Sequence, residues 1–209
     1  MTEPTSSPSP SVLFVGDSVT DCGRRDDPEG LGQGYVRVLA GTPQLAGRAV
    51  LNRGISGNRV VDLEERWADD VLAAEAGVVS ILIGINDTWR RYDSDDPTSA
   101  EDYEAGYRRL LTALVERSQP TLVLMEPFLL PVRPEQEGWR EDLDPKIAVV
   151  HRLAEEFGAV LVPTDVELTR LAGETGAAAL ASDGVHPTAE GHAAMAAIWL
   201  AHAGHLLVD

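Results

Sequence analysis

Five short apolar runs divide the chain, and polar or periodic stretches separate them. The runs cover residues 12–15, 49–51, 78–83, 121–125 and 159–162. Short continuous apolar runs are typical of strands that are buried on both faces of a parallel sheet. The pattern therefore predicts a five-stranded parallel sheet.

Between these runs, three segments space their apolar residues as one face of an α-helix does. The three faces comprise Tyr103, Tyr107, Leu110, Leu111 and Leu114; Ile147, Val150, Ala154 and Phe157; and Ala194, Ala197, Ile198 and Ala201. Ser99 with Asp102 resembles a capping box before the first helix. Asp144 and Pro145 predict the N-cap and the first residue of the second helix. Strands that alternate with helices predict a three-layer α/β/α sandwich.

The ends of the chain and its single cysteine bear on its organisation. Residues 1–11 are rich in Thr, Ser and Pro, so we expect a disordered tail rather than a signal peptide. Residues 12–209 show no internal repeat and no linker, which predicts a single domain.

No apolar run approaches the roughly 20 residues that a membrane helix needs. With Cys22 as the only cysteine, an intrachain disulfide is excluded, and a cytoplasmic location is the expectation.

The chain is strongly acidic, with 34 Asp and Glu residues against 17 Lys and Arg residues and a formal net charge of −17. Contacts with phosphate groups need clustered basic side chains, so this balance argues against nucleic acid as a partner. Anionic membrane surfaces are disfavoured for the same reason. We therefore expect neither a nucleic acid nor a membrane partner.

A candidate nucleophile follows the first apolar run directly. Gly16-Asp17-Ser18 turns the chain out of the predicted strand, at the sheet edge where ligands bind in open α/β folds. A serine needs a base and a group that orients the base, and Asp183 and His186 supply a carboxylate and an imidazole. Taken alone, Ser18 is more often a helix cap and the Asp-x-x-His pair a surface turn.

Two further segments fit the same chemistry. Gly57 follows the second apolar run in a glycine-rich turn, and Asn86 follows the third run. A backbone N–H at Gly57 and the side-chain amide of Asn86 could point at one oxygen, as an oxyanion hole requires. Each segment alone also fits an ordinary turn or a helix cap.

The four segments match, in order, the sequence blocks of the GDSL, or SGNH, hydrolases, so the chain resembles that family over about residues 12–200. The resemblance implies a flavodoxin-like SGNH fold and a serine esterase without a metal or a cofactor. It implies Ser18 as nucleophile, His186 as base and Asp183 as orienting acid. It also implies three oxyanion donors, namely the N–H groups of Ser18 and Gly57 and the side chain of Asn86. Val19 replaces the leucine of the family name, an apolar exchange that leaves the chemistry unchanged.

Within that family the chain is similar to the serine acetylxylan esterases. The similar segments are residues 21–24, 34–36, 66–67 and 86–93. This resemblance implies that a homo-oligomer hydrolyses short acetyl esters, removing acetyl groups from xylan fragments or other acetylated sugars through an acyl-enzyme intermediate. We expect Asp17, Arg59 and Trp89 to contact the substrate.

Other functions fit parts of the sequence. The same triad would serve a lysophospholipase or thioesterase that acts on longer acyl chains. Asp17, Asp87, Asp183 and His186 would offer oxygen and nitrogen ligands in a metal-dependent hydrolase. A non-catalytic carbohydrate-binding protein could keep the fold, although the complete triad argues against it.

Overall fold

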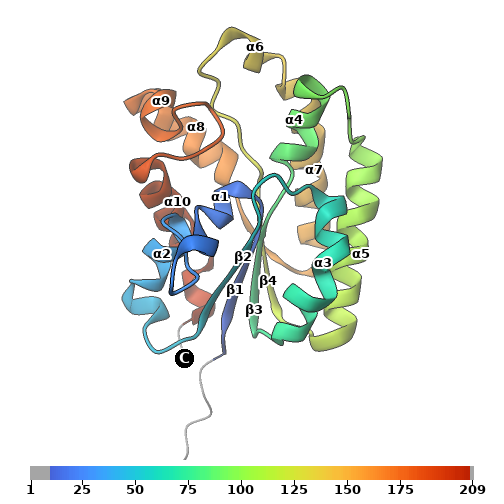
Figure 1. Ribbon diagram of the computed structural model, residues 1–209, viewed down its shortest axis with the longest axis vertical. Helices are drawn as coiled ribbons and strands as arrows, with labels where there is room; N and C mark the ends of the chain where they lie inside the picture. The colour runs from blue at the N-terminus through green and yellow to red at the C-terminus, as the bar shows by residue number, and fades with distance from the viewer. Residues whose placement is uncertain (1–9, 208–209) are drawn as a thin grey trace, which may run out of the picture.

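A five-stranded parallel sheet forms the centre of the computed structural model, which describes residues 10–207 (Figure 1). The strand order is β2-β1-β3-β4-β5. The strands are β1 (Val12–Gly16), β2 (Val50–Gly54), β3 (Val78–Leu82), β4 (Thr121–Met125) and β5 (Val160–Val162). The predicted sheet is confirmed. The first nine residues of the predicted tail lie outside the described residues.

Helices cover both faces of this sheet because successive residues of each strand point to opposite sides. On β1, Phe14 packs with Tyr35 and Trp199 on one face, whereas Leu13 and Val15 join the apolar cluster on the other. The first face carries α2 (Tyr35–Ala40), α8 (Thr164–Thr175) and α10 (Ala189–Ala203). The second face carries α3 (Val60–Asp70), α5 (Ala100–Ser118) and α7 (Arg140–Phe157). The three-layer sandwich is thus confirmed.

Short helices gather at the carboxyl ends of the strands, at the top of Figure 1. They are α1 (Ser18–Asp21), α4 (Ile85–Asp93), α6 (Pro134–Glu137) and α9 (Ala177–Leu180). Single 3₁₀ turns lie at Arg24–Asp26, Pro43–Leu45, Leu72–Ala74 and Gly204–Leu207. None of the described helices is both long and apolar enough to cross a membrane.

The structure corrects the predicted start of α7. Pro145 lies inside this helix, which begins at Arg140 rather than at the proline. A proline inside a helix removes one backbone hydrogen bond. Contacts before it stabilise the first turn: Leu143 is buried in an apolar cluster, and Arg140 forms ion pairs with Asp144 and Asp165.

The buried face of α10 also differs from the predicted one. Ala197 and Ala201 are exposed, whereas Met195 and Trp199 are fully buried. The larger side chains bury more apolar area, so they determine which face packs on the sheet. The face of α5 agrees with the prediction, since all five of its apolar residues are buried, and Ser99 caps the helix by accepting from the N–H of Asp102.

Candidate active site

The end of β1 places the candidate nucleophile at the sheet edge. A side chain at Gly16 would come within 2.2 Å of the carbonyl oxygen of Leu82, so only glycine lets the chain leave the sheet beside β3. Asp17 then caps α1, because its carboxylate accepts from the N–H of Val19 at 3.0 Å. Ser18 is the first residue of this helix and faces the space above the strands.

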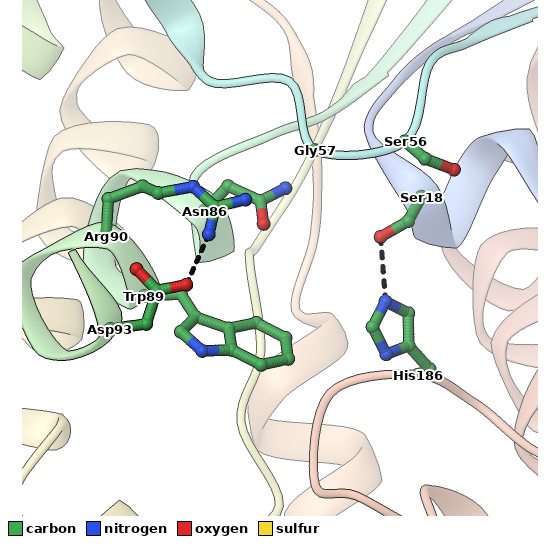
Figure 2. A pocket seen from close by; sticks show the side chains of 8 residues that line it. All are labelled: Ser18, Ser56, Gly57, Asn86, Trp89, Arg90, Asp93 and His186. Carbon is green, nitrogen blue, oxygen red and sulfur yellow. Dashed lines mark hydrogen bonds and ion pairs between the residues drawn. The ribbon is translucent and has the colours of Figure 1, made fainter.

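Ser18, His186 and Asp183 form a hydrogen-bonded chain, although 168 positions separate the serine from the histidine (Figure 2). The Oγ of Ser18 lies 3.0 Å from the Nε2 of His186. The Nδ1 of the same ring lies 2.7 Å from the Oδ2 of Asp183. These distances let the imidazole accept a proton from the serine while the carboxylate holds the ring in place.

The carboxylate of Asp183 is held in its ionised form. Burial tends to raise the pKa of Asp183, but hydrogen bonds from the His186 ring and from the N–H groups of His186 and Val185 outweigh it. The pKa therefore lies below its ordinary value. An ionised carboxylate here favours the imidazolium that forms when His186 takes up a proton.

A residue that the sequence did not indicate supports this loop. Gln136, fully buried on α6, donates from its side-chain amide to the backbone carbonyl of Asp183 at 2.7 Å. Its amide oxygen accepts from the N–H groups of Val132 and Arg133. Gln136 thus joins the segment after β4 to the loop that carries the acid and the base. Nothing in the sequence distinguishes it from a surface glutamine.

Gly57 and Asn86 face Ser18 across the site (Figure 2). Gly57 has a φ of +85°, a backbone conformation that favours glycine. Asn86 lies in the first turn of α4 and donates one side-chain N–H to the carbonyl of Asn58 at 3.1 Å. The amide has a second N–H, so it can also donate into the site.

Hydrogen bonds hold the loop of Gly57 to neighbouring elements. The N–H and the hydroxyl of Ser56 both donate to the buried carboxylate of Asp21 on α1, each at 3.0 Å. Arg66 of α3 donates to the side chain of Asn58 at 2.7 Å and to the carbonyl of Gly16 at 3.1 Å. These bonds hold the candidate oxyanion donors fixed relative to the end of β1.

A small pocket of about 260 Å³ opens over these groups. Its lining residues are Ser18, Ser56, Gly57, Asn86, Trp89, Arg90, Asp93 and His186 (Figure 2). The indole ring of Trp89 lies 5.8 Å from the imidazole ring of His186, measured between ring centroids. Ser56, Arg90 and Asp93 were not among the expected site residues.

A family model of the GDSL-like lipase/acylhydrolase family matches residues 14–194. The chain belongs to this family. It is 40% identical over 205 residues to an acetylxylan esterase of Geobacillus stearothermophilus, covering 92% of this chain and 93% of the relative. The solved structure of Axe2, an acetylxylan esterase of the same organism, has a TM-score of 0.84 and 37% identity, and covers 93% of this chain and 94% of that one. A variant of Axe2, described as an acetyl-xylooligosaccharide esterase, has a TM-score of 0.86 and 37% identity, with 98% of each chain covered.

The comparisons confirm the resemblance to GDSL hydrolases and the fold that it implies. As a member of the family, the chain is a hydrolase of carboxylic esters.

Two of the expected substrate contacts in this GDSL-like hydrolase do not line the pocket in the structure. Asp17 is completely buried and serves as the cap of α1, so it does not reach the pocket. Arg59 precedes α3 and forms ion pairs with Asp62 and, at 2.9 Å, with Asp96. Trp89, by contrast, does line the pocket.

Two buried carboxyl groups lie directly beside the site residues in the sequence. Burial raises the pKa of Asp17 and that of Asp87 to about 7. Within the described part of the chain, one oxygen of Asp17 has no hydrogen-bond partner, and Asp87 accepts long hydrogen bonds of 3.3 Å from the N–H of Val60. Among residues 10–207, no three His, Cys, Asp or Glu residues are arranged to share a metal ion, so the four metal-ligand candidates do not converge.

Proposed function

We propose that this GDSL-like hydrolase is a serine esterase that removes acetyl groups from xylan fragments or other acetylated sugars. The observation that carries the proposal is the hydrogen-bonded chain from Ser18 through His186 to Asp183, which opens into a small pocket. A hydroxyl becomes an effective nucleophile when a positioned base takes its proton and a third group orients that base.

The reaction follows from this arrangement in two steps. His186 accepts the proton of Ser18, whose Oγ attacks the ester carbonyl, and the protonated imidazole then gives its proton to the departing alcohol. Water next attacks the acetyl-serine, His186 takes its proton, and acetate leaves as Ser18 regains its hydrogen. In both steps the N–H groups of Ser18 and Gly57 and the amide of Asn86 stabilise the oxygen that becomes negative.

The relatives support both the residues and the substrate class. Three solved catalytic mutants of Axe2 replace a serine, a histidine or an aspartate with alanine, the residue types of the proposed triad. The proteins compared by sequence and by structure are described as esterases of acetylxylan or acetyl-xylooligosaccharides. Trp89 adds an aromatic ring at the pocket on which a sugar ring can pack.

Replacing the nucleophile tests this proposal. Ser18→Ala should lower kcat for an aryl acetate and for acetylated xylo-oligosaccharides by about 10⁴–10⁶-fold, with unchanged folding by circular dichroism. Ser56→Ala is the matched control, because its hydroxyl also lies at the pocket but donates to Asp21 rather than to His186. We expect a far smaller loss in this control. Hydrolysis by Ser18→Ala at nearly the wild-type rate, or loss of activity on chelation with EDTA, would contradict the serine mechanism.

A further inference from the structure

An ion pair forms part of the pocket wall on the side away from His186. The guanidinium of Arg90 contacts the carboxylate of Asp93, and both residues belong to the last turns of α4 (Figure 2). The hydroxyl of Ser94 also donates to Asp93. Both side chains of the pair are about one third exposed, at 33% and 34%, so they keep part of their hydration.

The geometry of ester hydrolysis assigns a direction to each part of the substrate. The carbonyl oxygen must point to Gly57 and Asn86 to be stabilised as it becomes negative. The alcohol oxygen must lie near the Nε2 of His186, since it receives its proton from there. The acyl chain is the remaining substituent, and the space left for it lies on the side away from the Nε2 of His186, where the ion pair forms the pocket wall (Figure 2).

We propose that the Arg90–Asp93 ion pair limits the length of the acyl chain, so that acetyl esters react and longer acyl esters do not. This inference rests on the proposed esterase function and adds the residues that determine its acyl specificity.

The pair offers a longer chain no apolar surface. A methyl group at Gly57 would lie 3.8 Å from a terminal nitrogen of Arg90, so the guanidinium lies beside the loop of the oxyanion donors. Among the described residues, none with an aliphatic side chain lines the pocket. Additional methylene groups would therefore strip water from two charged groups without providing any new hydrogen bond, which is unfavourable.

The adjacent arginine provides a matched control. Arg91 does not line the pocket; it pairs with Glu141 and Asp142 of α7, each at 3.1 Å. The double variants Arg90→Ala/Asp93→Ala and Arg91→Ala/Glu141→Ala each remove one arginine of α4 and one acid. Both leave the net charge unchanged, so a change in net charge cannot explain a difference between them.

The test compares kcat/KM for p-nitrophenyl acetate, butyrate and hexanoate, which share one leaving group and differ only in the acyl chain. The wild type and the Arg91→Ala/Glu141→Ala control should prefer acetate strongly. In Arg90→Ala/Asp93→Ala the ratio of butyrate to acetate should rise by about tenfold or more, the scale of discrimination that one or two methylene groups allow. Thermal unfolding of both variants, compared with the wild type, checks that each remains folded.

Other outcomes separate this inference from the proposed function. An unchanged ratio in Arg90→Ala/Asp93→Ala would overturn the inference. If Arg90→Ala/Asp93→Ala lost activity on acetylated xylo-oligosaccharides but kept its activity on aryl esters, the inference would also be overturned. The ion pair would then contact the sugar rather than the acyl chain. A wild type that already prefers hexanoate, with activity that Ser18→Ala abolishes, would overturn the inference but leave a serine esterase. Absence of any Ser18-dependent ester hydrolysis would remove the proposed function itself.

Discussion

The side chain of Asn86 is the clearest case in which one residue's surroundings determine its chemistry. It is only 4% exposed, and its amide donates to the carbonyl of Asn58. That bond fixes the amide before any substrate arrives, so the second N–H need not reorganise as charge develops. Donors that are positioned in advance contribute most to stabilising a transition state.

We therefore expect Asn86→Ala to act on kcat rather than on KM. Loss of one oxyanion donor should lower kcat by about 10²–10³-fold, or about 2.7–4 kcal/mol, because the charge it stabilises exists only in the tetrahedral intermediate. Steady-state kinetics with an aryl acetate measures both constants. Asn86→Asp has nearly the same shape but offers no N–H, so it should be at least as impaired. An effect confined to KM would instead indicate a contact with the bound substrate.

At the scale of elements, Asp87 connects two helices through a buried carboxyl group. It lies in the first turn of α4, and its oxygens accept from the N–H of Val60, the first residue of α3. Burial raises its pKa to about 7. In the unfolded chain an aspartate loses its proton near pH 4, so between about pH 4 and 7 the folded state binds more protons. Stability from this group therefore falls as pH rises through that range.

Asp87→Asn should remove this dependence, because the amide carries no charge at any of these pH values. The gain in the thermal midpoint relative to the wild type should be larger at pH 8 than at pH 5. The effect of the substitution on the free energy of unfolding should differ between the two pH values by a few kcal/mol at most, on the order of 1.4 kcal/mol per pKa unit. Thermal unfolding followed by circular dichroism at both pH values measures it. An equal change at pH 5 and pH 8 would mean that Asp87 does not titrate in this range.

Helix boundaries are predicted less well from sequence patterns than strands and helix faces are. The strands and the face of α5 could be predicted because apolar periodicity follows directly from burial on a sheet. The start of α7 could not, because Pro145 favours a helix start locally while the ion pairs of Arg140 and the packing of Leu143 extend the helix before it. Those partners lie on other elements or further along the helix.

At the scale of the whole molecule, the number of subunits remains a prediction from the family resemblance. Large tryptophans near loops or in the last helix are residues that could form symmetric contacts between subunits. Trp199, however, is fully buried within the chain, where its N–H donates to Ser80 at 3.0 Å, and Trp139 is only 6% exposed. Neither ring therefore indicates an interface.

We still expect a homo-oligomer in solution. Light scattering at micromolar protein concentration should give a dimer or a larger assembly, since the resemblance to acetylxylan esterases implies one. A mass of 22.4 kDa, that of a single chain, would contradict this prediction.

The sequence by itself determined the sheet and the central residues of the site. Short apolar runs end in parallel strands at one edge, so Ser18, Gly57 and Asn86, which follow three such runs, had to come together there. The local spacing of Asp183 and His186 also suffices for their hydrogen bond.

Only the tertiary structure decided which neighbouring side chains share the pocket. Asp17 and Arg59 stand beside site residues in the sequence, yet one is buried under α1 and the other pairs with Asp96. Arg90 and Asp93 reach the pocket, and Gln136 reaches the loop of the triad from another segment. The physical reason is that the direction and burial of a polar side chain depend on partners far away in the sequence. A buried strand, by contrast, can be recognised from its own apolar residues.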